Sequence, residues 1–206
     1  MTLTPRGTPQ GTSGGTPGGT PIGTLPLILR GVTLLARGRA RGLNCFRDTP
    51  QAFFYSLAPG LAIMVAALVE GLAEGAGAGA MGQIPGTLCV MLAPAVLSYE
   101  MARFWGREAF WNRYIVAFNW CQWLLPVLGF LLIAGLTLAR LAGISGEGAI
   151  RIMLVCLAGY ALWLNWFLAR HGLALTAWRA AGLVAAVNLG TIAIVFGPVM
   201  LASSLG

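Results

Sequence analysis

The sequence contains no lysine, one histidine (His171) and one aspartate (Asp48), and charged residues make up only 9% of its 206 residues. An ordinary soluble domain carries roughly 25% charged residues. Hydrophobic residues make up 57% of this chain. A soluble fold of this size cannot bury that much apolar surface, so the composition excludes a soluble domain and predicts a protein of the membrane.

The patterns that enzymes and metal sites need are also missing. His-Glu-x-x-His and a pair of aspartates are absent, and the one Gly-x-Ser-x-Gly, at residues 11–15, lies in the Gly, Thr and Pro tail with no strand before it, which argues against the common serine, metallo- and aspartyl hydrolase mechanisms. The four cysteines lie far apart, and no two of them form Cys-x-x-Cys, so neither a zinc site nor a redox dithiol is indicated. We therefore predict no catalytic residue, no metal and no cofactor, and a protein that is not an enzyme.

Five apolar stretches of the chain have the length of membrane spans. A helix needs about 20 apolar residues to cross about 30 Å of hydrocarbon. The stretches are continuous, whereas the strands of a membrane barrel alternate in polarity and are about half as long. We predict an all-α membrane protein, a five-transmembrane-helix bundle with a disordered N-terminal tail. The predicted spans are residues 52–69, 84–104, 114–138, 152–169 and 180–201.

The chain divides into three regions of different composition. Residues 1–24 are rich in Gly, Thr and Pro and have almost no apolar side chains, so they are predicted to be disordered. Residues 25–51 form a basic juxtamembrane segment, and residues 52–206 form the five-helix transmembrane domain.

The juxtamembrane segment has an amphipathic pattern. Ile28, Val32 and Leu35 recur at helical spacing, which is typical of a helix lying in the plane of the lipid head groups. Because two glycines weaken the helix, a flexible basic flank is the other interpretation. The arginines that share the opposite face are Arg30, Arg37 and Arg41.

Arginine is distributed unevenly among the segments outside the spans. Cytoplasmic segments retain positive charge, so we predict the N-terminus in the cytoplasm and the C-terminus outside. The composition suggests a bacterium, and hence the inner membrane. Only Arg140 and Arg151 lie on the predicted outer side. The arginines on the predicted inner side are Arg6, Arg30, Arg37, Arg39, Arg41, Arg47, Arg103, Arg107, Arg113, Arg170 and Arg179.

Anionic lipid head groups are the partners that this charge pattern favours. No basic segment carries the interleaved aromatics of an RNA-binding module, so no nucleic acid is expected. Gly182, Ala186 and Gly190 recur at intervals of four, a spacing that serves close helix contacts within one chain, with another membrane protein or in a homo-oligomer. The predicted head-group contacts are Arg30, Arg37, Arg41, Arg107 and Arg113.

Polar residues lie at similar depth in three of the spans. Glu100 lies near the end of the second span, Asn119 and Gln122 lie early in the third, and Asn165 lies near the end of the fourth. Polar groups in hydrocarbon normally face partners or a cavity. These four residues form a candidate polar site, although helix packing is the commoner use of Asn and Gln. Prolines inside the spans, such as Pro94, free backbone carbonyls and can open a polar notch.

Two stretches resemble the Yip1 family of small membrane proteins. TPQAFFYSL (Thr49 to Leu57) is similar to the Pro-x-x-Phe-Phe start of the first span in bacterial members. ARFWGREAFWNRYIVAFNWCQWLLP (Ala102 to Pro126) has that family's order of a glycine after the second helix, a short aromatic connection and a mid-span proline. The resemblance implies five spans and a basic cytoplasmic N-terminal segment. The Asp-Leu-Tyr-Gly-Pro motif of eukaryotic members is absent, so their Rab-linked trafficking role is not implied.

The sequence as a whole predicts a non-catalytic, Yip1-like membrane-organising or interaction component. The alternative is a small-solute or lipid transporter, or a subunit of one, that uses the candidate polar site. A cavity that reaches Glu100 would favour transport. A tightly packed interior would favour a scaffold.

Overall fold

A computed structural model describes the chain except for residues 1–24, 76, 142–146 and 205–206. The predicted disordered tail lies outside these described residues. All the elements that the structure contains in its described part are helical. They are α1 (Leu25–Ala36), the 3-10 helix η2 (Ala40–Cys45), α2 (Pro50–Ala73), α3 (Gly77–Phe104), the 3-10 helix η3 (Glu108–Phe110), α4 (Trp111–Gln122), α5 (Leu124–Leu141), α6 (Glu147–Gly172) and α7 (Ala177–Ser204).

Five helical segments are long and apolar enough to cross a membrane. This finding confirms the predicted all-helical bundle with five spans, and the chain is a multi-span integral membrane protein. Several helices extend beyond the predicted spans, because a helix need not end where its apolar stretch ends. The segments are Pro50–Ala73, Ile84–Phe104, Glu108–Thr137, Ile150–Gly172 and Ala177–Gly197.

The third span consists of two helices, α4 and α5. Proline has no N–H group, and its ring clashes with the carbonyl four residues earlier. Pro126 lies in the first turn of α5, so it cannot bond to the carbonyl of Gln122, the last residue of α4. Trp123 separates the two helices, and its N–H donates to the carbonyl of Trp120, three residues earlier, at 3.3 Å. The regular helix is therefore interrupted at Trp123.

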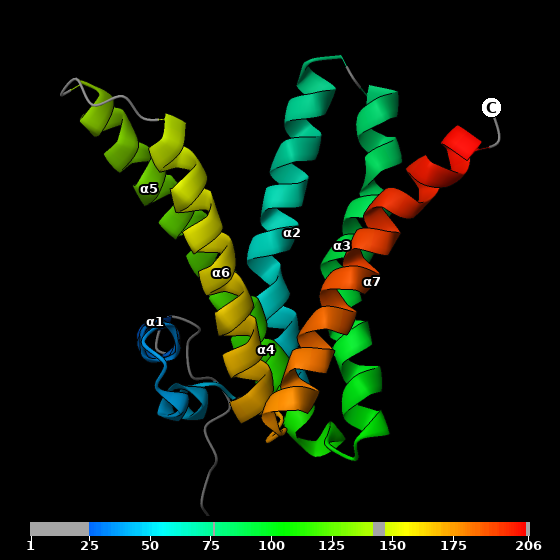
Figure 1. Ribbon diagram of the computed structural model, residues 1–206. Helices are drawn as coiled ribbons and strands as arrows, with labels where there is room; N and C mark the ends of the chain where they lie inside the picture. The colour runs from blue at the N-terminus through cyan, green and yellow to red at the C-terminus, as the bar shows by residue number, and fades with distance from the viewer. Residues whose placement is uncertain (1–24, 76, 142–146, 205–206) are drawn as a thin grey trace, which may run out of the picture.

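The spans pack into a ring at one end of the bundle and diverge at the other (Figure 1). In the ring, α2 contacts α3 and α4, α7 contacts α3 and α6, and α6 contacts α4. Beyond the ring, α5 and α6 lean together away from α2, α3 and α7. The side chains of the diverging parts are exposed, and Phe130 and Val155 are each 72% exposed. Apolar surfaces of this kind suit contact with lipid.

The hydrophobic core lies inside the packed end of the bundle. The residues from Tyr114 to Phe118 of α4 are buried in succession, which makes α4 the central helix. Leu168 of α6 and Leu183 of α7 are fully buried against the same cluster.

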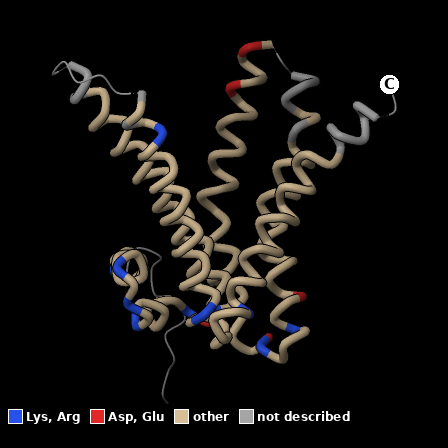
Figure 2. The backbone as a smooth tube through the Cα atoms, viewed as in Figure 1, with Lys and Arg blue, Asp and Glu red and all other residues tan. Residues whose placement is uncertain are grey.

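The charged residues mark the two ends of the bundle (Figure 2). Arginines gather where α3 and α6 end and where α4 and α7 begin, and acidic residues mark the far end of α2. We call the packed end the arginine-rich end. Arg151 lies at the start of α6, near the opposite end. Which side of the membrane the arginine-rich end faces stays a prediction from the charge pattern.

The juxtamembrane segment forms a helix that packs on the bundle. Leu35 of α1 is fully buried, and Ile28 and Val32 pack against the same core. In Figure 1, α1 is seen nearly end-on beside the upright spans, so it runs across the bundle. The Tyr160 hydroxyl of α6 donates a 2.9 Å hydrogen bond to the carbonyl of Ala36 at the end of α1. Protein therefore covers much of the apolar face of this amphipathic helix.

Two glycines of the juxtamembrane segment allow it to pack closely on itself. A Cβ atom at Gly31 would lie 2.8 Å from Cε2 of Phe46, and one at Gly42 would lie 2.7 Å from the Gly31 carbonyl oxygen. The glycines let η2 fold back onto α1. A third glycine, Gly38, has a φ of 70° and follows α1 in the left-handed conformation that glycine adopts readily.

Candidate functional site

A cavity of about 340 Å³ lies within the ring of spans, lined by residues of α2, α3, α4, α6 and α7. Its volume is in the range of small-molecule sites, roughly 300–1,000 Å³. The polar side chains that line it are Ser56, Asn119, Gln122, Asn165, Asn188 and Thr191.

The structure brings together three residues of the candidate polar site and leaves one outside. Asn119, Gln122 and Asn165 line the cavity. Glu100 does not line it, and its side chain is exposed. Pro94 of α3 lines the cavity, and the six residues from Pro94 to Glu100 turn a helix by about 240°. Glu100 therefore lies on another face of α3 and about 9 Å farther along the helix than Pro94.

Ser56 and Thr191 were not part of the sequence-based prediction. Both lie inside apolar spans and both line the cavity. A search for small hydroxyl residues at similar depth would have found them. Hydroxyl groups are weak signals, however, because Ser and Thr commonly bond to their own helix in membrane spans.

Several of the lining polar groups are satisfied within the protein. The Asn119 amide donates a 2.9 Å hydrogen bond to Ser56 Oγ, and Ser56 Oγ donates to the carbonyl of Phe53 at 2.6 Å. On α7, Asn188 and Thr191 each donate to a carbonyl of their own helix, at 2.7 Å and 2.8 Å. These groups shape the wall of the cavity.

The amides of Gln122 and Asn165 have no hydrogen-bond partner among the described residues. Each amide can donate two hydrogen bonds, and its oxygen can accept others. An amide without a partner in an apolar environment costs on the order of 1–3 kcal/mol. Both amides border the cavity, so water or a polar solute can bond to them there.

Two prolines add hydrogen-bond acceptors near the same space. Pro94 cannot donate to the carbonyl of Val90, and Pro126 cannot donate to that of Gln122. Val90 and Gln122 both line the cavity. The two residues whose carbonyls the prolines leave without the usual donor therefore both belong to the cavity wall.

None of the described residues that line this cavity carries a charge. A charged solute without a counter-charge in an apolar interior would lose much of its solvation energy. Amides and hydroxyls instead match a solute that has both donors and acceptors and no net charge. Within the described ranges, no three His, Cys, Asp or Glu side chains are placed to hold a metal ion together.

The cavity is closed toward the arginine-rich end. On that side, the residues of α4 from Tyr114 to Ala117, Leu168 of α6 and Leu183 of α7 are buried. On the other side, α5 and α6 begin to diverge from the remaining spans (Figure 1).

The arginines predicted to contact lipid head groups all lie toward the arginine-rich end. Those of α1 and the segment after it are exposed, and Arg107 is half-buried in the turn between α3 and η3. Arg113 is half-buried at the start of α4, and its Nε has no partner among the described residues. The exposed arginines are Arg30, Arg37 and Arg41.

Comparison with known proteins found no protein-family model, no curated protein and no solved structure that matches this chain. The resemblance to the Yip1 family rests on the two quoted stretches and stays a prediction.

Proposed function

We propose that this membrane protein binds a small, uncharged polar solute in the central cavity and carries it across the membrane, alone or as the binding subunit of a transporter. The observation that supports the proposal best is the pair of amides, Gln122 and Asn165, which face the cavity without a partner among the described residues. Transport is the alternative that the sequence leaves open. The cavity does not reach Glu100, so the proposal rests on the two amides that face the cavity.

A carrier must expose its site to each side of the membrane in turn. In this bundle, the buried core closes the side toward the arginine-rich end. Trp123 lies at the break between α4 and α5 and also lines the cavity. We propose that this break is the hinge about which α5 moves relative to the ring of spans.

Solute flux into proteoliposomes tests the proposal. Glycerol, erythritol and urea are suitable probes, with swelling followed by light scattering. We expect faster swelling than in empty liposomes for at least one probe. We also expect Asn165→Leu and Gln122→Leu to slow it about fivefold or more, since each removes hydrogen bonds worth about 1 kcal/mol.

Thr137→Val is the matched control. The Thr137 hydroxyl donates to the carbonyl of Ile133 in its own helix, 2.9 Å away, and the side chain is exposed on α5. This variant should keep the wild-type rate. Equal rates in empty and protein-containing liposomes for all three probes would rule out carriage of such solutes.

A second proposal is the non-catalytic, Yip1-like organising role, which gains support from the exposed apolar faces of the diverging helices. A Cβ atom at Gly182 of α7 would meet nothing within 4 Å, so this position is open to a helix of another membrane protein or of a second copy. Crosslinking and pull-down from native membranes test this role. A partner recovered in stoichiometric amount, together with no solute flux, would favour it.

A further inference from the structure

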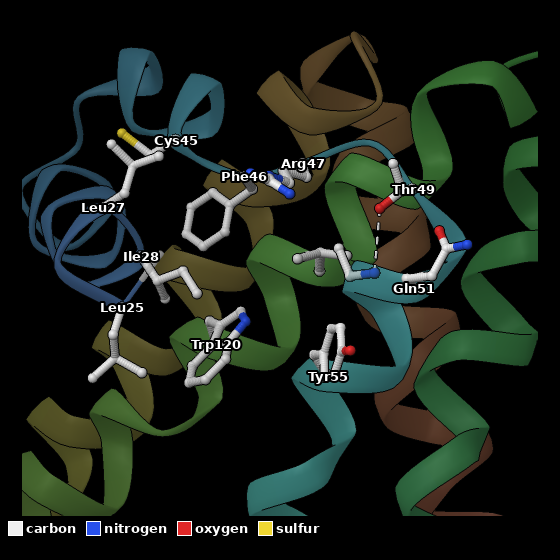
Figure 3. Close-up of a pocket in the computed structure, with 12 residues that line it drawn as sticks. Leu25, Leu27, Ile28, Cys45, Phe46, Arg47, Thr49, Gln51, Tyr55 and Trp120 are labelled. Carbon is white, nitrogen blue, oxygen red and sulfur yellow. Dashed lines mark hydrogen bonds between the residues drawn. The ribbon is translucent and has the colours of Figure 1, made fainter. Parts of the chain in front are cut away.

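A second cavity, of about 320 Å³, separates α1 from the start of α2. Its walls come from four parts of the chain (Figure 3). α1 contributes Leu25 and Ile28, the link before α2 contributes Phe46, α2 contributes Tyr55, and α4 contributes Val116 and Trp120. We call this cavity the α1–α2 groove.

The groove is polar at one end and apolar at the other. Arg47, Thr49 and Gln51 lie together where α2 begins (Figure 3). Tyr55 lies one turn farther along α2 than Gln51, about 6 Å deeper at 1.5 Å per helical residue. Trp120 faces the groove from α4 at the apolar end. The polarity thus changes along the direction in which the spans cross the membrane.

The edge of the groove is accessible from outside the protein. Leu25 is 51% exposed and Tyr55 is 70% exposed. Arg47 is exposed as well, so its guanidinium can meet a ligand at the polar end. A lipid of the surrounding leaflet can therefore reach the groove sideways without crossing the core.

We propose that the α1–α2 groove binds one phospholipid with an anionic head group. The guanidinium of Arg47 holds the head-group phosphate, because its planar donors match a phosphate in two-pronged geometry. Its positive charge favours a head group with net negative charge over one, such as phosphatidylcholine, whose choline cation balances the phosphate. One acyl chain lies along the apolar wall between Ile28 and Trp120. The positive end of the α2 dipole adds to the attraction of an anion at this place.

This site is separate from the solute cavity. On α2 the groove uses Ala52 and Tyr55, whereas the solute cavity uses Ser56 and Gly60. On α4 the groove uses Val116 and Trp120, and the solute cavity uses Phe118, Asn119 and Gln122. The lipid proposal therefore does not depend on the transport proposal.

Quenching of tryptophan fluorescence by brominated lipid tests the site. The full chain is placed in nanodiscs at one copy per disc, with brominated phosphatidylglycerol or brominated phosphatidylcholine of the same acyl chains as a minor component. Quenching at the groove is the part of the total quenching that is lost in Trp120→Phe. We expect brominated phosphatidylglycerol to reach half of this quenching at about fivefold lower mole fraction than brominated phosphatidylcholine, a ratio that corresponds to about 1 kcal/mol.

In Arg47→Gln, the two brominated lipids should quench Trp120 at equal mole fractions. Arg39→Gln is the matched control, because Arg39 is an exposed arginine of the same end that does not line the groove. It should keep the preference for phosphatidylglycerol. Both substitutions are at exposed positions, so they leave the core intact.

Four results would overturn the proposal. Quenching that is the same in Trp120→Phe would mean that no acyl chain occupies the groove. A preference lost equally in Arg39→Gln and Arg47→Gln would mean general surface attraction. Loss of the quenching on addition of millimolar glycerol 3-phosphate would assign the groove to a free phosphate-bearing head group. Quenching that appears only in discs with two copies of the protein would assign the groove to a second copy.

Discussion

The amide of Asn119 on α4 donates a 2.9 Å hydrogen bond to Ser56 Oγ on α2, across 63 residues of sequence. Ser56 is 2% exposed, and its hydroxyl continues the chain of hydrogen bonds to the carbonyl of Phe53 at 2.6 Å. The bond between Asn119 and Ser56 joins the first span to the central helix at the wall of the cavity. Because it engages the Asn119 amide, the cavity amides without a partner among the described residues are those of Gln122 and Asn165.

The hydrogen bond between Asn119 and Ser56 should contribute a measurable free energy to folding. We expect a double-mutant cycle of Ser56→Ala and Asn119→Leu to give a coupling energy of about 0.6 kcal/mol, the average for hydrogen bonds between membrane helices. The measurement is the free energy of unfolding in bicelles. A coupling energy of zero would show that the two side chains do not interact in the membrane.

Two glycines of α7 should respond differently to the same substitution. A Cβ atom at Gly190 would lie 2.6 Å from Cδ1 of Leu97 on α3, whereas one at Gly182 meets nothing within 4 Å. Gly190→Val should therefore lower the free energy of unfolding by about 1–3 kcal/mol through overpacking. Gly182→Val, its matched control, should be nearly neutral. Equal losses would contradict the close contact of α7 with α3.

Removing one hydroxyl should loosen α1. In Tyr160→Phe, the Ala36 carbonyl loses the donor that joins it to α6 at 2.9 Å, a bond worth about 1 kcal/mol. Hydrogen exchange of residues 25–45 should become about fivefold faster, the factor that 1 kcal/mol corresponds to. Tyr55→Phe removes an exposed hydroxyl that has no partner among the described residues, and it should leave the exchange unchanged.

The five spans could be predicted because each is a continuous apolar stretch, and the depth of Asn119, Gln122 and Asn165 followed from their distance to the ends of those spans. The direction in which each side chain points around its helix could not be predicted from the sequence. Apolar residues surround most of α3, so nothing in its sequence showed that Pro94 faces the cavity and Glu100 does not.

The α1–α2 groove could not be predicted because its walls come from residues far apart in sequence, such as Leu25 and Trp120. The role of Gly31 was also hidden. Propensity alone indicated a weakened helix, whereas the structure places the ring of Phe46 against this glycine. Contacts between remote segments decide both features.

The orientation of the bundle can be tested with reporter fusions. The charge pattern predicts that fusions after Gly75 and at Gly206 both report the outside of the cell. The arginine-rich end would then lie at the inner leaflet. A cytoplasmic signal from the fusion after Gly75 would reverse the predicted orientation.

The reactivity of two neighbouring positions on α6 tests the central claim, a polar cavity that water enters within the ring of spans. Asn165 lines the cavity, and Leu164 is 1% exposed in the core. Each is changed to cysteine in a chain without Cys45, Cys89, Cys121 and Cys156, and a small hydrophilic thiol reagent is added to the protein in nanodiscs. We predict that Asn165→Cys reacts and that Leu164→Cys does not. No reaction at Asn165→Cys, or equal reaction at both positions, would contradict the hydrated cavity.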